Sequence, residues 1–169
     1  IGPPPLSLFV REQGRAALEL ARLGSRKKVL ANAPRGDGHP VLVLPGLLAG
    51  DLSTLPLRRF LRSVSYDARG WDLGLNLGPT DSLRGRLDAL LTKLRGDHGH
   101  RVSLVGWSLG GLYARELARA RPDAVRCVIT LGSPFAGAPR ASNAWKLYEQ
   151  LSGRQVDDGE QRTRMRQPP

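Results

Sequence analysis

"RVSLVGWSLGGLYARELARARP", residues 101–122, carries the clearest structural signal in this 169-residue chain. The segment begins as an apolar run, passes a serine that stands between glycines, and continues as a basic, helix-like stretch. A short apolar run that ends at a turn is typical of a strand covered on both faces. The pattern therefore predicts a strand over residues 101–107, a sharp turn at Ser108, and a helix over residues 109–121 that Pro122 ends.

The same order of strand and helix recurs on both sides of this segment. Apolar runs predict strands over residues 41–44 and 124–131, and residues 66–71 form a weaker strand candidate. Helices are predicted over residues 54–64, with Pro56 in the first turn, and over residues 80–95, where "GDHGH" ends the helix. Five leucines of the second helix are predicted to share one face: Leu83, Leu87, Leu90, Leu91 and Leu94. Covered strands that alternate with helices predict an α/β fold, in which helices flank a parallel sheet.

The length of the chain is enough for one hydrophobic core. We expect an N-terminal helical segment and loop over residues 1–38, a core over residues 39–151, and a polar, disordered tail over residues 152–169. The strand over residues 124–131 should lie at an exposed edge of the sheet, and Cys127 within it should be a small buried side chain.

The composition of the chain limits its possible binding partners and its place in the cell. The net charge of +11 suggests an anionic partner, but the basic residues are scattered and no aromatic residues interleave with them, so we expect no nucleic-acid binding. No apolar run is long enough to cross a bilayer, which leaves open a peripheral membrane contact. No leader segment is visible, which favours the cytoplasm, but the chain does not begin with Met. We expect no metal and no cofactor, and the sequence does not determine the oligomeric state.

The serine lies in the pattern G-x-S-x-G, formed by Gly106, Trp107, Ser108, Leu109 and Gly110, which Gly111 follows. The pattern falls where an apolar strand meets a helix, as a nucleophile elbow requires. The glycines remove side chains that would collide across the sharp turn. Ser108 would then present its hydroxyl at the start of a helix, where unpaired N–H groups favour negative charge. The alternative is a glycine-lined turn with a serine that caps the helix.

A second loop supports this hypothesis. In "VLVLPGLLAGD" (residues 41–51), a covered strand runs directly into Pro45, Gly46 and Leu47. Acyl transfer requires two N–H donors that point at the developing oxyanion. We expect the N–H groups of Leu47 and Leu109 to be these donors; the alternative for the first loop is an ordinary strand-to-helix turn.

Three segments together resemble the lipase and esterase branch of the α/β-hydrolase fold family: "VLVLPGLLAGD", "VSLVGWSLGGLYARELA" and "VITLGSPFAGAPRASNAW". The resemblance runs from about residue 39 to residue 151, in the order of the family. It implies that Ser108 is the nucleophile, that Leu47 and Leu109 donate to the oxyanion, and that "SNAWKLYEQL" begins a lid over an acyl-chain pocket. The implied activity is hydrolysis of a small-molecule or lipid ester.

The chain departs from the family in its acid and base, which normally follow the serine in the order Asp or Glu, then His. No histidine follows Ser108. His39, His98 and His100 precede strands, so they should be solvated loop residues at the sheet edge opposite the site. Asp123 should lie at that same edge, and Asp157 and Asp158 fall in the tail. We therefore expect a fragment that carries the nucleophile half of a hydrolase and is inactive alone.

Three other functions stay open. A binding protein could keep this fold without a catalytic base, and an acyltransferase could use the same scaffold. A basic nucleic-acid binder would show association that falls steeply with salt.

Overall fold

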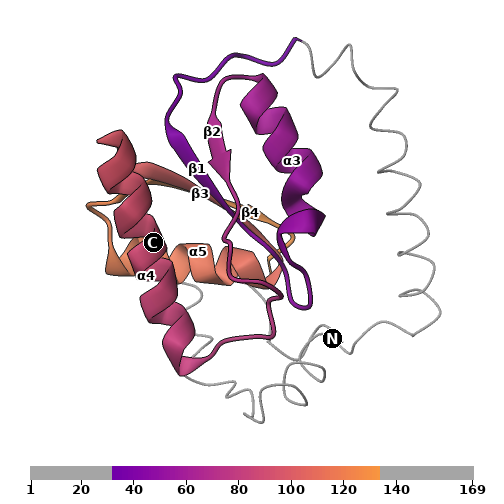
Figure 1. Cartoon of the computed structure of the whole chain (residues 1–169), viewed down its shortest axis with the longest axis vertical. Coiled ribbons are helices and arrows are strands. Elements are labelled where there is room, and N and C mark those ends of the chain that lie inside the picture. Colours follow the sequence, from indigo (N-terminus) through magenta and orange to yellow (C-terminus); the bar gives the residue numbers. More distant parts are fainter. Residues whose placement is uncertain (1–31, 134–169) are drawn as a thin grey trace, which may run out of the picture.

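The computed structural model describes residues 32–133 as a parallel sheet with helices on both faces. The elements follow one another as β1 (Pro40–Leu44), α3 (Asp51–Ser63), β2 (Asp67–Arg69), α4 (Asp81–His98), β3 (Val102–Trp107), α5 (Leu109–Ala120) and β4 (Val125–Leu131). The four strands lie in the order β2-β1-β3-β4, and every neighbouring pair is parallel. This arrangement confirms the predicted α/β fold (Figure 1).

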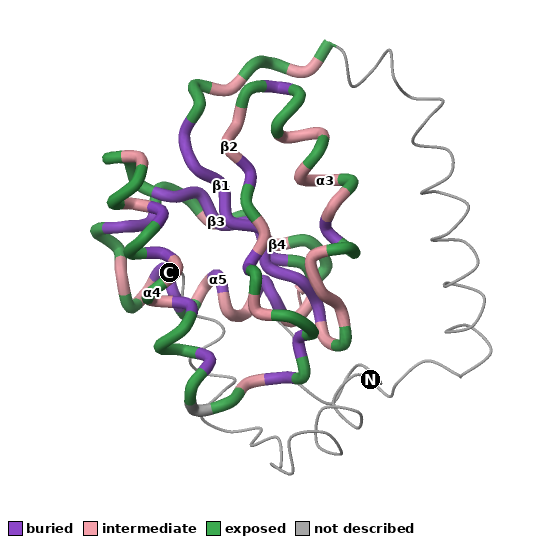
Figure 2. The backbone as a smooth tube through the Cα atoms, in the orientation of Figure 1, coloured by how far each residue is buried: buried purple, intermediate pink, exposed green. Residues whose placement is uncertain are grey.

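Alternate residues of the central strands face opposite sides of the sheet, as the two-residue repeat of a strand requires. Leu42 and Leu44 of β1 belong to the larger core cluster, which α4 and α5 cover. Val41 and Val43 belong to a smaller cluster, which α3 covers. Figure 2 shows that β1 and most of β3 are buried, whereas buried, intermediate and exposed residues alternate along the helices. The leucines predicted to share one face of α4 do pack into or against the larger core: Leu83, Leu87, Leu90, Leu91 and Leu94.

Two helix boundaries differ from the predicted ones. Helix α3 begins at Asp51 rather than at residue 54, so Pro56 lies beyond the first turn. Helix α4 continues through Gly96 to His98 and ends at Gly99, which has φ 66°. A glycine inside a helix costs about 1 kcal/mol relative to alanine, which the packing of α4 tolerates, whereas glycine adopts the left-handed conformation at a helix end without steric cost.

Strand β4 pairs with β3 on one side and has no second partner strand among the described residues. This agrees with the predicted edge position. The prediction that Cys127 is buried is wrong, because its side chain is exposed. The burial of a strand residue depends on what covers its face, and Arg126 and Ile129 of β4 are exposed as well.

Some predictions lie outside the described residues. These are the N-terminal helical segment up to residue 31, the start of a lid at 142–151 and the polar tail with Asp157 and Asp158. In residues 32–133, no helix has the length and apolar character that crossing a membrane requires.

The amino edge of the sheet carries a polar network around His39. Nε2 of His39 lies 2.8 Å from Oγ of Ser103, and Nδ1 pairs with the carboxylate of Asp37. Asp37 also accepts a hydrogen bond from Arg126 at 2.8 Å. The imidazole of His39 is buried, so the prediction of a solvated loop histidine is wrong for this residue. The network links the ends of β1, β3 and β4.

The hydrogen bond from Arg126 is the main reason that the pKa of Asp37 is lowered, and the contacts with His39 add to this effect. A lowered pKa means that the carboxylate form stabilises the folded state. That contribution is complete above the ordinary carboxyl pKa of about 3.9 and is lost as the pH falls through the folded-state pKa.

We predict that Asp37→Asn lowers the free energy of unfolding at neutral pH and that the difference from wild type shrinks as the pH falls below about 4. Urea unfolding of both proteins across this pH range measures the effect. A difference that does not depend on pH would show that the carboxylate charge has no part in it.

We also predict that Leu91→Ala lowers the free energy of unfolding by about 2–5 kcal/mol, because Leu91 is fully buried between α4 and the sheet and its loss leaves a cavity. The matched control is Leu52→Ala on α3, because Leu52 is 85% exposed and its loss should cost little. Denaturant unfolding compares the two variants, and equal losses would contradict the assignment of the core.

Candidate active site

Ser108 forms the turn between β3 and α5. Its backbone has φ 51° and ψ −118°, which is rare for a residue with a side chain. The N–H of Ser108 donates to the carbonyl of Leu131 at 2.9 Å, and its carbonyl accepts from the N–H of Gly111 at 3.0 Å. Strain of this kind costs about 1–3 kcal/mol and persists where the surrounding structure enforces it, often at functional sites. Ser108 itself is partly exposed.

Glycines allow the start of α5 to pack directly against the strands. A Cβ on Gly106 would collide with the backbone of Gly110 and Gly111. A Cβ on Gly110 would collide with the backbone of Leu44 and would lie 2.7 Å from the carbonyl oxygen of Pro45. These contacts explain in physical terms why the pattern around Ser108 needs glycine on both sides.

The loop after β1 lies beside this turn. A Cβ on Gly46 would stand 3.3 Å from Cβ of Ser108 and 3.4 Å from the carbonyl oxygen of Trp107. The two predicted donor segments therefore meet at the carboxyl edge of the sheet. Within residues 32–133, the backbone N–H groups of Leu47 and Leu109 have no hydrogen-bond acceptor. N–H groups in this state, next to a serine hydroxyl, are able to stabilise an oxyanion.

Asn76 is a residue of this edge that the sequence analysis missed. Its side chain is fully buried and donates to the carbonyl of Pro45 at 2.9 Å. Its backbone carbonyl accepts from Leu48 at 2.7 Å, and its backbone N–H donates to Ala49 at 2.9 Å. The only sequence signal was a polar residue between leucines in "GLNLG", and such a pattern does not reveal its partners.

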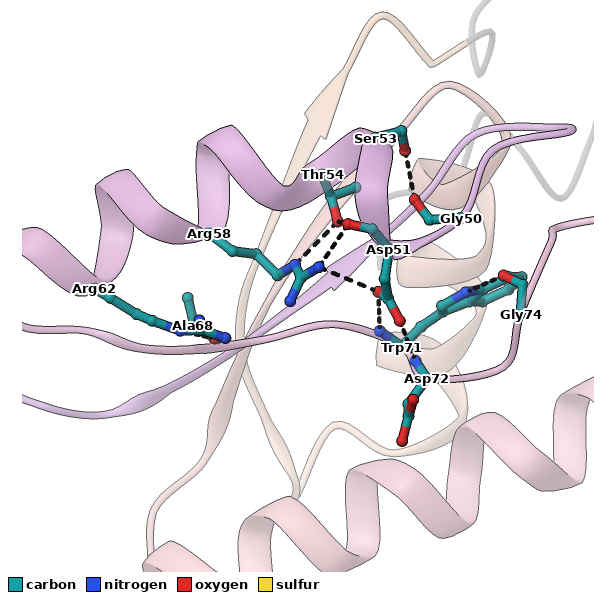
Figure 3. Close-up of polar contacts among 10 residues, drawn as sticks. All are labelled: Gly50, Asp51, Ser53, Thr54, Arg58, Arg62, Ala68, Trp71, Asp72 and Gly74. Atoms are coloured by element: carbon teal, nitrogen blue, oxygen red, sulfur yellow. Dashed lines mark hydrogen bonds and ion pairs between the residues drawn. The ribbon is translucent and has the colours of Figure 1, made fainter.

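The segment that leads to Asn76 is itself fixed to the start of α3, as Figure 3 shows. The carboxylate of Asp51 accepts hydrogen bonds from the backbone N–H groups of Trp71, at 3.0 Å, and Asp72, at 2.9 Å. The indole N–H of Trp71 donates to the carbonyl of Gly74 at 2.9 Å. These contacts explain why α3 begins as early as Asp51, since its first carboxylate holds a loop about twenty residues further along the chain.

The histidines lie away from Ser108. His39 precedes β1, and His98 ends α4 with Nε2 2.8 Å from the carboxylate of Asp67, the first residue of β2. His100 is exposed just before β3. The prediction that all three lie at the amino edge is confirmed, but His98 belongs to a helix and is partly buried. The structure therefore brings none of them to the serine.

Asp123 also lies at the amino edge, before β4. The hydrogen bond from Arg121 is the main reason that the pKa of the Asp123 carboxyl is lowered, and the pairing with Arg95 adds to this effect. Asp88 pairs with Arg121 at 2.8 Å and is the main cause of the raised pKa of that guanidinium. Because these ion pairs hold Asp123 at the amino edge, its carboxylate does not lie beside Ser108.

Comparison with known proteins places the chain in a family. A model described as "Alpha/beta hydrolase family" matches residues 17–168. A protein of Klebsiella pneumoniae (strain 342) named as a carbamate hydrolase, RutD, is 33% identical over 130 residues, which are 72% of this chain and 48% of that protein. Pimeloyl-[acyl-carrier protein] methyl ester esterase of Shewanella woodyi is 28% identical over 110 residues, or 65% of this chain and 42% of the esterase. The chain thus spans about half the length of these relatives.

Among solved structures, monoacylglycerol lipase of Paleococcus ferrophilus has the same fold. It superimposes with a TM-score of 0.50 at 20% identity, over 69% of this chain and 49% of the lipase. The likeness agrees with the parallel sheet and its flanking helices. With the family model matching most of its length, the chain belongs to the alpha/beta hydrolase family.

Proposed function

We propose that the full-length protein is a serine hydrolase that cleaves carboxylic esters, with Ser108 as its nucleophile. One observation carries this proposal: Ser108 stands partly exposed in a strained strand-to-helix turn, beside a loop and a helix start whose N–H groups lack acceptors within residues 32–133. That combination is what an acyl-transfer site requires.

The proposed reaction begins with attack of Oγ of Ser108 on the ester carbonyl carbon. The carbonyl oxygen becomes an oxyanion, which the N–H groups of Leu47 and Leu109 would stabilise at the positive end of α5. The alkoxide leaves with a proton, and water then releases the acid from Ser108. Proton transfer in both steps needs a general base. Since the three histidines of this sequence lie at the opposite edge, we propose that the base comes from outside residues 1–169.

Exposed apolar side chains at the edge of the sheet that carries Ser108 support an apolar ester as substrate. Trp107 is exposed directly before Ser108, and Leu48, Leu75 and Leu77 are exposed on the loops that follow β1 and β2. These loops lie at the same edge of the sheet as Ser108. An apolar acyl or alcohol group would bury such side chains on binding. The relatives are named as a methyl ester esterase and a carbamate hydrolase. Hydrolysis of an ester or of a carbamate involves attack on a carbonyl carbon that bears a leaving group.

A binding protein without catalysis is the second candidate. The observation that favours it is that no histidine within residues 32–133 reaches Ser108, so that a hydroxyl without a base would stay protonated. The two candidates differ in the reactivity of the full-length protein toward an ester-like electrophile.

We predict that a fluorophosphonate labels the full-length protein at Ser108, because phosphonylation uses the same nucleophile, base and oxyanion donors as ester attack. Mass spectrometry of the labelled peptide identifies the site. Ser108→Ala should abolish labelling and reduce hydrolysis of a p-nitrophenyl ester by at least about a thousandfold.

The matched control is Ser103→Ala, because Ser103 is a buried serine of β3, the strand that leads to Ser108, but lies near the opposite end of that strand. It should leave the label on Ser108. A folded full-length protein that does not react, or one that still reacts after Ser108→Ala, would favour the binding protein or a different nucleophile.

A further inference from the structure

We propose that Asn76 is a positioning residue, which holds the loop of Leu47 in register with Ser108. Its catalytic consequence rests on the proposed function, because Asn76 acts through the oxyanion donor and does not touch the reacting atoms. Five hydrogen bonds converge on this one side chain and its backbone.

The first contacts fix the two ends of the loop. The side-chain amide of Asn76 donates to the carbonyl of Pro45 at 2.9 Å, before the loop turns. The backbone N–H of Asn76 donates to the carbonyl of Ala49 at 2.9 Å, after the turn. Leu47, whose N–H has no acceptor within the described residues, lies between these two anchors. One residue from a different loop therefore sets the path of the backbone on both sides of Leu47.

A further contact holds the strained part of the loop. Leu48 has φ 56°, in the left-handed region, and its N–H donates to the carbonyl of Asn76 at 2.7 Å. A residue with a side chain keeps such a conformation only where its surroundings enforce it. The hydrogen bond from Leu48 fixes the Leu47–Leu48 peptide, which directly follows the Gly46–Leu47 peptide that carries the N–H of Leu47.

The remaining contacts link this loop to the helix of the nucleophile. Oδ1 of Asn76 accepts hydrogen bonds from the hydroxyl of Tyr113 at 3.2 Å and from the N–H of Gly78 at 3.1 Å. Tyr113 lies on α5, about one turn beyond Leu109. Asn76 thus bridges the backbone that carries one proposed donor and the helix that carries the other.

The hydrogen-bond partners of the Asn76 side chain require both a donor and an acceptor, which an amide provides. The nitrogen of the side chain faces a carbonyl, and its oxygen faces an N–H and a hydroxyl, so both ends are used. Aspartate has the same shape but, when ionised, places a second oxygen against the carbonyl of Pro45. When protonated, it regains a donor at that place. In the Asn76→Asp variant, the hydrogen bond to the carbonyl of Pro45 should therefore depend on pH. Burial should raise the pKa of the new carboxyl group.

The experiment compares full-length wild type, Asn76→Asp and the control Ser103→Ala, which removes a buried polar group at the opposite edge of the sheet. The readouts are the second-order rate of fluorophosphonate labelling, kcat and KM for a p-nitrophenyl ester, and Tm. A displaced oxyanion donor should lower the labelling rate and kcat of Asn76→Asp by about 10- to 100-fold, with a smaller change in KM. Ser103→Ala should lower Tm but keep the labelling rate within about twofold of wild type.

The pH dependence adds a readout that a purely structural role would not move. The ratio of the labelling rate of Asn76→Asp to that of wild type should rise as the pH falls from about 8 to about 5, because the variant carboxyl gains a proton. If Asn76→Asp does not fold, Tyr113→Phe removes the hydroxyl that reaches Asn76, and a fall in labelling rate of about threefold or more supports the proposal.

The outcomes separate the two proposals. No labelling of folded wild type would overturn the proposed function, and the catalytic role of Asn76 with it. Labelling of wild type at Ser108, together with an unchanged rate in Asn76→Asp, would overturn the role of Asn76 alone. If Asn76→Asp and Ser103→Ala lost the same amount of labelling rate and of Tm, the role of Asn76 would be structural only.

Discussion

Direct backbone contact between the start of α5 and the ends of β1 and β3 is the constraint on which the rest of this structure depends. Gly106 and Gly110 permit that contact, because any Cβ at either position would enter the backbone opposite. Ser108 lies in the turn between these elements and has φ 51°, which is rare for a residue with a side chain. The strain is localised at one residue, and the same residue is partly exposed at the carboxyl edge of the sheet.

The two edges of the sheet differ in how their polar groups are used. At the carboxyl edge, Asn76 forms hydrogen bonds with the loop that follows β1. The N–H groups of Leu47 and Leu109 have no acceptor in the described part of the chain. At the amino edge, charged groups pair with one another: Asp37 with Arg126 and His39, and Asp123 with Arg95 and Arg121. Charges that pair with one another are not available to a substrate, and the proposed site therefore lies at the carboxyl edge, where N–H donors have no acceptor among the described residues.

Local patterns were sufficient for much of this fold. Apolar runs placed β1, β3 and β4 within a residue or so, and the leucine spacing of α4 identified its buried face. The helix boundaries were less predictable, because long-range contacts fix them. Asp51 joins α3 through hydrogen bonds to Trp71 and Asp72, and the last turn of α4 continues past Gly96 to place His98 beside Asp67.

From the sequence alone one could read the alternation of strands and helices, the family, and the glycines that Ser108 needs as neighbours, because each is written in residues a few positions apart. Only the folded chain revealed the hydrogen-bond partners of Asn76 and His39 and the exposure of Cys127. The partners of Asn76 stand 31 and 37 residues away, and Ser103 stands 64 residues from His39. The exposure of Cys127 depends on what covers the face of β4. Burial and hydrogen bonding between distant segments are properties of the packed chain, and no local pattern encodes them.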